Sequence, residues 1–267
     1  MTQTAERPAE FVEALAKGLA IIEAFDSVHP EMTLSEIARR VGLSPAAARR
    51  SLITLSHLGY VGQTAKRFHL TPKVMSLGSG VYFSAGIDEI LQPAVRGIVE
   101  TFGDASSVGV LSGDDVIYVA HYSQQRARRK AAVVGACYPA YATSMGRILL
   151  AGRTDEEIDA YLARYDPQRL TEKTCTNPKA LRAEVMVARR NGYSTTVDQL
   201  DYGITALAVP IRDAQGRTVA ALNTSGYTGM VSPDELVEKR LPELTATASA
   251  IGHDILKYPA LQSVLAG

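Results

Sequence analysis

The stretch Thr33–Tyr60, TLSEIARRVGLSPAAARRSLITLSHLGY, constrains the fold most, because it predicts two short helices joined by a tight turn. Thr33, with Glu36 three positions on, has the pattern of a capping box that begins a helix. Gly42 suits the left-handed conformation that ends a helix, and Ser44 followed by proline begins the second helix. Such a pair is either a helix-turn-helix or an ordinary helical hairpin.

Apolar residues recur at helical spacing in both predicted helices and should face inward. They are Leu34, Ile37, Ala38 and Val41 in the first helix, and Leu52, Leu55 and Leu58 in the second. The start of the second helix is instead small and basic, and this is where a helix-turn-helix meets base edges and phosphates.

Charge distribution favours DNA binding over a simple hairpin. The chain has 28 basic and 28 acidic residues overall, yet between Thr33 and Pro72 its only acid is Glu36. A locally basic face attracts phosphate whatever the total charge. The predicted DNA-binding residues are Arg39, Ser44, Ala46, Ala47, Arg49, Arg50, Lys66 and Arg67.

The flanking segments complete a predicted winged helix-turn-helix over residues 10–72. One face of a preceding helix should pack beneath the pair through Phe11, Val12, Leu15, Leu19, Ile22 and Phe25. Two extended runs, Tyr60–Gln63 and Arg67–Thr71, predict a hairpin whose tip carries Lys66 and Arg67. A wing of this kind meets the sugar-phosphate backbone.

Residues 73–86 are expected to form a linker helix, with Val74, Leu77, Val81 and Tyr82 at helical spacing. This apolar stripe fits either simple core packing or pairing with its copy in a dimer. Residues 87–260 alternate helical and extended patterns, which predicts one α/β domain with an antiparallel sheet covered by helices. The fold class is therefore α+β with two domains.

Composition and motifs narrow the function. No run of eighteen apolar residues and no signal-peptide core occurs, so we expect a cytoplasmic protein without a membrane partner. Cys137 and Cys175 are expected to be free thiols, and no spacing typical of a metal site is present. Neither a nucleophile elbow nor a phosphate loop nor a dinucleotide fingerprint occurs, so we expect no cofactor, and an enzyme is the remote alternative. A binding protein that uses its helix-turn-helix only for assembly is disfavoured by the segregated basic charge.

Several long motifs in order resemble those of the IclR family of bacterial transcription regulators. They are FVEALAKGLAIIEAF, GLSPAAARRSLITLSHLGYV, FHLTPKVMSLG, YPAYATSMGRILLAG, GYSTTVDQ and LAVPIRDAQGRTVAALNTSG. The resemblance runs from about Phe11 to Leu256, and is greatest to regulators of protocatechuate, p-hydroxybenzoate and β-ketoadipate pathways. It implies a GAF-like effector domain, homodimers that often pair into tetramers, and a near-palindromic operator.

The resemblance also implies where an effector binds. The corresponding positions are Tyr141, Thr143, Ser144, Met145, Asp198, Ala206, Asn223 and Ser225. Asn223 and Ser225 alternate along their predicted strand, so they should share one face. Thr143 either caps the next helix only, or does so beside backbone amides that receive a carboxylate. A phenolic hydroxyl is expected beside Asp198.

Three features bear on effector identity. Cys137-Tyr138 precede Pro139 where relatives commonly have Arg-Leu, and the segment from Asp198 to Gly203 is shorter than in relatives. The run Arg126, Arg128, Arg129 and Lys130 is a solvated loop, an anion contact or a subunit interface. The expected effector is a hydroxybenzoate or a dicarboxylate such as β-ketoadipate, and the alternative is another small organic acid from a non-aromatic pathway.

Overall fold

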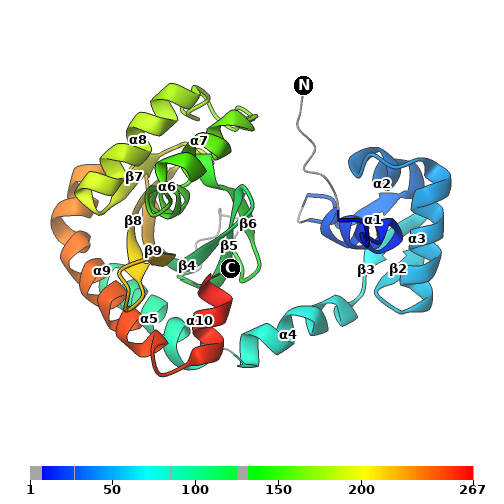
Figure 1. The fold of residues 1–267 in the computed structure, drawn as a ribbon, viewed down its shortest axis with the longest axis horizontal. Helices are drawn as coiled ribbons and strands as arrows, with labels where there is room; N and C mark the ends of the chain where they lie inside the picture. The colour runs from blue at the N-terminus through cyan, green and yellow to red at the C-terminus, as the bar shows by residue number, and fades with distance from the viewer. Residues whose placement is uncertain (1–7, 27, 85, 125–131, 267) are drawn as a thin grey trace. The chain divides into compact units, whose positions relative to one another are not determined.

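The computed structural model describes residues 8–26, 28–84, 86–124 and 132–266 (Figure 1). Its contacts divide the chain into two compact units, Met1–Gly80 and Val81–Gly267. The division falls within α4 (Met75–Ser84), inside the segment expected as a linker helix.

The first unit is a winged helix-turn-helix, as predicted. In chain order it contains α1 (Glu13–Glu23), β1 (Glu31–Thr33), α2 (Leu34–Arg40), α3 (Pro45–His57), β2 (Val61–Thr64) and β3 (Arg67–Leu70). The three strands form an antiparallel sheet in the order β1-β3-β2. The strand β1 was not predicted, because its three residues pair with a segment far along the chain.

The predicted helix boundaries of α2 and α3 are confirmed by their caps. Thr33 Oγ1 accepts from the Glu36 N–H, and Glu36 in turn accepts from the Thr33 N–H, which is a complete capping box. Ser44 Oγ accepts from the Ala47 N–H at 3.2 Å. Gly42 between the helices has a φ of 66°, the left-handed region that glycine adopts without strain.

The prediction that one apolar face of α1 packs beneath α2 and α3 is wrong for most of the residues on that face. Phe11, Val12, Leu15 and Leu19 are 42–62% exposed, while Ile21 is fully buried. The helix α1 therefore joins the core through its last turns, and its first turns present an apolar surface. Leu58, also predicted to face inward, is half exposed because it follows the last turn of α3.

The linker helix α4 follows a short 3₁₀ turn, Pro72–Val74. Leu77 and Val81 on it are about half exposed, so they do not serve as core in the described residues. Tyr82 differs, because it packs against the second unit's core and its hydroxyl donates to Asp88 Oδ1 at 2.7 Å.

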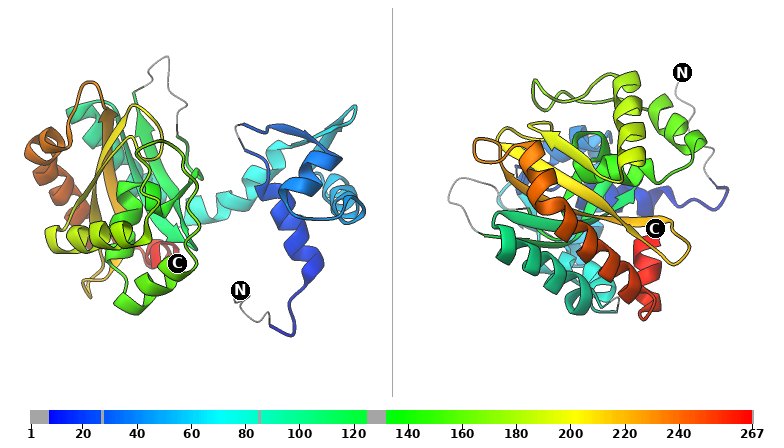
Figure 2. Two further views of the ribbon diagram at one scale, coloured as in Figure 1. Left: turned by 90° about the horizontal axis from the view of Figure 1, so that it is seen from above. Right: turned by 90° about the vertical axis from the view of Figure 1, so that its left-hand side faces the viewer.

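The second unit contains a six-stranded antiparallel sheet in the order β6-β5-β4-β9-β8-β7 (Figures 1 and 2). The antiparallel sheet was predicted, but its strand order was not. The strands are β4 (Ala105–Ser112), β5 (Asp115–Ser123), β6 (Cys137–Pro139), β7 (Ser194–Val197), β8 (Ile204–Arg212) and β9 (Thr218–Tyr227). The helices are α5 (Ile87–Phe102), α6 (Ser144–Ala151), α7 (Asp155–Ala163), α8 (Pro178–Asn191), α9 (Pro233–Ile255) and α10 (Pro259–Ala266). The short strand β6 and the helix α10 were not predicted.

Each face of this sheet has its own apolar core. One core lies between the sheet and α5, α9 and α10, and includes Leu91, Leu207, Leu222, Leu244 and Leu261. The other lies between the opposite face and α6, α7 and α8, and includes Tyr118, Met145, Ala208 and Ala221. Small residues in this second core let α6 lie close to the strands.

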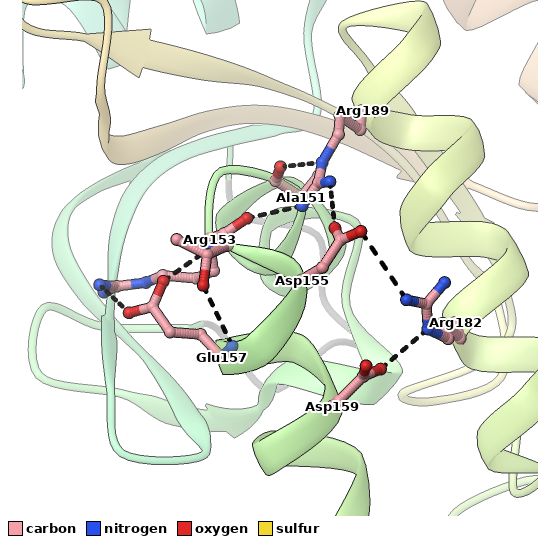
Figure 3. Close-up of polar contacts among 8 residues, drawn as sticks. Ala151, Arg153, Asp155, Glu157, Asp159, Arg182 and Arg189 are labelled. Carbon is pink, nitrogen blue, oxygen red and sulfur yellow. Dashed lines mark hydrogen bonds and ion pairs between the residues drawn. The ribbon is translucent and has the colours of Figure 1, made fainter.

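Ion pairs join α7 to α8 outside the second core (Figure 3). Arg189 donates to Asp155 Oδ1 at 2.6 Å, and Arg182 donates to Asp159 Oδ1 at 2.9 Å. Arg189 also donates to the carbonyl of Ala151, the last residue of α6, and to that of Arg153 just beyond it. The hydrogen bond from Arg189 holds the pKa of Asp155 below its ordinary value. One guanidinium therefore connects three helices.

Three further properties concern membrane-spanning helices, cysteine thiols and metal sites. None of the described helices is long and apolar enough to cross a membrane. Cys137 and Cys175 are free thiols, as predicted. Among the residues that the structure describes, no cluster of His, Cys, Asp and Glu could hold a metal ion.

The first turn of α6 packs against the preceding 3₁₀ turn, Ala140–Ala142, with no room for a side chain at Gly146. A Cβ at Gly146 would lie 2.0 Å from the Ala140 carbonyl oxygen, which is backbone and cannot rotate away. We expect Gly146→Ala to destabilise the protein by at least about 2 kcal/mol, measured by urea denaturation.

The matched control is Gly97→Ala in α5, where a Cβ would meet nothing within 4 Å. Because alanine favours a helix interior, this control should raise stability by about 0.5–1 kcal/mol. Equal effects of the two substitutions would contradict the close packing at Gly146.

Candidate nucleic-acid interface and effector site

The exposed start of α3 is the candidate DNA-reading surface. Ser44, Ala46, Arg49 and Arg50 are exposed and Ala47 is partly exposed, while Ala48 is fully buried and belongs to the core. Ala46 allows close approach, and Arg49 and Arg50 supply the long cationic groups on this surface. Ala48 can therefore contribute nothing to DNA contact.

The basic residues of the first unit fall into two groups. Arg40 pairs with Asp26, and Arg67 lies 3.8 Å from Glu36 and donates to the Glu31 carbonyl at 3.1 Å. In contrast, Arg39, Arg49, Arg50 and Lys66 are exposed and form no ion pair with described residues. This second group is available to phosphate without breaking an internal contact.

The wing tip carries one of these available groups. The turn between β2 and β3 contains Ala65, whose φ of 54° is in the left-handed region, followed by exposed Lys66. Arg67, by contrast, begins β3 and pairs with Thr64 across the hairpin and with Thr33 on β1. Lys66 is therefore the more available of the two predicted wing residues.

The candidate effector site centres on the start of α6. Thr143 caps this helix, and its Oγ1 accepts from the Gly146 N–H at 2.9 Å. The first N–H groups of any helix lack an intrahelical partner, so those of Ser144 and Met145 stay available. Both residues are almost fully buried, and Met145 packs against Gly109 of β4.

Beneath α6, the register of the sheet aligns polar residues in rows that share one face. One row crosses β4, β9 and β8 as Ala105, Ser225 and Ala206. The adjacent row crosses β5, β4 and β9 as His121, Ser107 and Asn223. The structure thus brings Ala206, Asn223 and Ser225 together, as the strand pattern predicted for the latter two.

His121 and Ser107 were missed by reasoning from the sequence. The Ser107 hydroxyl and His121 Nδ1 are 2.9 Å apart, and the Ser107 N–H donates to Asn223 Oδ1 at 2.8 Å. The available signal was a polar residue inside each of two extended runs, Ser106–Leu111 and Val116–Tyr122. A bulge opposite Val108/Gly109 changes which residues of β5 face α6, so simple alternation did not select His121.

Asp198 lies at the end of β7 with a φ of 53° and closes the turn to β8. Its Oδ1 accepts from the Gly203 N–H at 2.7 Å and from the Thr228 hydroxyl at 2.8 Å. Asp198 therefore has a structural role, and only its second carboxylate oxygen is left for another partner.

The buried side chain of Arg147 on α6 contacts the same turn. Its guanidinium lies 2.7 Å from Glu184 Oε2 and donates to Gln199 Oε1 at 2.8 Å. Gln199 directly follows Asp198, so α6, α8 and this turn form one connected unit. Burial lowers the pKa of Arg147, and the nearby carboxylate of Glu184 opposes that shift.

Tyr141 and Tyr138, which the sequence singled out, both contact other parts of the second unit. The Tyr141 hydroxyl donates to the Gln168 carbonyl at 3.1 Å and accepts from the Gln168 N–H at 3.0 Å. Tyr138 packs edge-on against Tyr118 with ring centroids 5.0 Å apart. The basic run Arg126–Lys130 lies outside the described residues.

Comparisons with known proteins agree with this architecture. The model of the IclR helix-turn-helix domain matches residues 14–65, and that of the bacterial transcriptional regulator IclR C-terminal domain matches residues 81–253. The Pca regulon regulatory protein of Pseudomonas putida is 36% identical over 92% of this chain and 85% of its own. The p-hydroxybenzoate hydroxylase transcriptional activator of Acinetobacter baylyi is 32% identical over 92% of both chains.

A solved structure is also similar throughout. It is the crystal structure of an IclR homologue from Microbacterium hydrocarbonoxydans in complex with 4-hydroxybenzoate. It has a TM-score of 0.72 and 25% identity, covering 91% of this chain and 99% of its own. With both domains matched in order, this chain belongs to the IclR family and is a DNA-binding transcriptional regulator.

Proposed function

We propose that this regulator binds a near-palindromic operator as a homodimer, under the control of a hydroxybenzoate-like acid that binds between α6 and the sheet. The observation that carries the proposal is the polar face of the sheet beneath the start of α6, with Asn223 and Ser225 side by side with small Ala206. The named functions of two relatives and the ligand of the Microbacterium homologue support the chemical class.

The DNA contacts are proposed from exposure and free charge. The start of α3 enters the major groove, where Ser44, Ala46 and Ala47 approach the backbone or bases closely and Arg49 and Arg50 bind phosphate or guanine. Arg39 and Lys66 add phosphate contacts, and Arg67 contributes less because it is held by Glu36 and the Glu31 carbonyl.

Replacing Arg49 and Arg50 together by alanine should weaken operator binding by at least about tenfold in a gel-shift assay. The slope of log affinity against log salt concentration should also become shallower by about 1 for each phosphate that is no longer neutralised. Arg190→Ala, an exposed arginine on α8, is the control and should leave both quantities unchanged. Unchanged affinity in the double variant would refute the assignment of α3.

The homodimer is proposed from the apolar surface of the first unit. Phe11, Val12, Leu15 and Leu19 are exposed together on and before α1, and contiguous apolar surface of this kind marks association sites. Leu77 on α4 is a further exposed apolar residue of this unit. Tetramers would then form from pairs of dimers, as the family resemblance implies.

Leu15→Glu with Leu19→Glu should shift the protein toward monomer in analytical ultracentrifugation, because two charges would be buried in the interface. The control Lys17→Gln changes a charged residue of the same helix and should leave the assembly intact. A dimer that is equally stable in all three proteins would place the interface elsewhere.

The effector is proposed to place its carboxylate at the start of α6, beside Thr143 and against the backbone amides of Ser144 and Met145. Its ring would lie over Ala206 and Asn223, beside Ser225, with Tyr141 holding the adjoining loop and Asp198 closing the neighbouring turn. Ser225 is half-buried and its hydroxyl forms no hydrogen bond with described residues, so it is available to a ligand.

Calorimetric titration should give saturable binding of 4-hydroxybenzoate or protocatechuate, and Ser225→Ala should weaken it by about three- to tenfold. Thr101→Ala, at an exposed threonine of α5, serves as the control. Binding of β-ketoadipate alone would move the effector class to dicarboxylates. Failure of all these acids to bind would refute the aromatic assignment.

A further inference from the structure

One buried nitrogen beneath α6 has no partner in the described protein. His121 Nδ1 contacts the Ser107 hydroxyl at 2.9 Å, but His121 Nε2 is buried and makes no hydrogen bond. Buried polar atoms in native proteins are nearly always paired with protein, ordered water or a ligand. The Nε2 atom therefore marks a position where a partner from beyond the described residues belongs.

The register places this nitrogen beside the proposed effector site. His121 pairs with Ser107 and Ser107 pairs with Asn223, so the three residues occupy one row across β5, β4 and β9. Neighbouring strands are about 4.8 Å apart, so the His121 and Asn223 backbones are separated by roughly 10 Å. The His121 ring stacks on Tyr118 of the second core, which confirms that it faces α6.

The chemistry of His121 selects the kind of group that can pair with it. Burial lowers the pKa of His121, so the imidazole is neutral near pH 7 and carries one donor and one acceptor. With Nδ1 engaged by Ser107, Nε2 offers a single hydrogen bond whose direction depends on the tautomer. A hydroxyl can both donate and accept, so it suits either tautomer, whereas a carboxylate can only accept and suits only the tautomer with its proton on Nε2.

We propose that His121, positioned by Ser107, binds a ring hydroxyl of the effector and so distinguishes hydroxylated from unhydroxylated aromatic acids. This inference rests on the proposed function, because it assumes that the acid lies under α6. A site built to hydrogen-bond a hydroxyl discriminates against the analogue that lacks it, because the protein atom is then left unpaired. His121 thereby sets specificity, while the start of α6 holds the carboxylate that all these acids share.

Two substitutions of His121 distinguish the roles of its two ring nitrogens. The amide of His121→Gln reaches close to the position of Nε2, whereas the shorter His121→Asn retains a polar group only near Nδ1. The test measures dissociation constants of 4-hydroxybenzoate and benzoate for the full-length wild type and both variants by calorimetry. Circular dichroism melts establish that each variant is folded.

The preference of the wild type for 4-hydroxybenzoate over benzoate should fall by about tenfold in His121→Asn, with benzoate affinity nearly unchanged. His121→Gln should recover most of that preference. Ser107→Ala, which removes the group that orients the ring, should reduce the preference by a smaller factor, and it replaces His121→Asn if that variant does not fold.

The outcomes distinguish this inference from the proposed function. If the wild type binds 4-hydroxybenzoate and the variants keep its full preference over benzoate, the role of His121 is refuted and the proposed function stands. If both acids weaken equally in His121→Asn, the residue has a purely structural role and the inference is overturned. If the wild type binds no hydroxylated aromatic acid, both proposals fail.

Discussion

The close contact between Gly146 and the Ala140 carbonyl is the constraint on which the second unit depends. It allows the 3₁₀ turn before α6 to fold directly back on the helix, so that the buried start of α6 lies against the sheet. Small residues on the strands, including Ala208 and Ala221, accept the helix at short range. A larger side chain at Gly146 would lift α6 and separate its amides from the polar rows of β4, β5 and β9.

The basic residues of the first unit are of two kinds, those with internal partners and those without. Arg40 pairs with Asp26, and Arg67 lies near Glu36 and donates to the Glu31 carbonyl. In contrast, Arg49, Arg50 and Lys66 form no ion pair within the described residues. The balanced total charge of the chain hides this division. A regulator that binds phosphate gains from having several unpaired cations close together on its small DNA-binding domain.

Much of the fold could be predicted because local signals agree with the tertiary structure. Caps such as Thr33 and Ser44 begin their helices where the sequence predicted, because side chain and backbone satisfy each other within a few residues. Strands β1 and β6 could not be predicted, because three residues form a strand only through a distant partner. The exposed face of α1 was misassigned because apolar periodicity does not distinguish a buried face from an exposed one.

The candidate site was predicted in part for a similar reason. Asn223 and Ser225 alternate on a regular strand, so their shared face follows from the sequence. His121 escaped that reasoning, because an irregularity in the β4–β5 pairing places it on the same face as Tyr118, three residues earlier. A period of two cannot predict this placement without knowledge of the bulge.

Under the proposed function, a hydroxybenzoate bound in the second unit changes how the first unit binds DNA. Fluorescence anisotropy, on operator DNA selected from random duplexes by the protein itself, tests it most directly. The selected DNA should contain two inverted half-sites, and saturating 4-hydroxybenzoate should change the apparent dissociation constant by at least about fivefold. An operator affinity that is identical with and without the saturating acid would contradict the account.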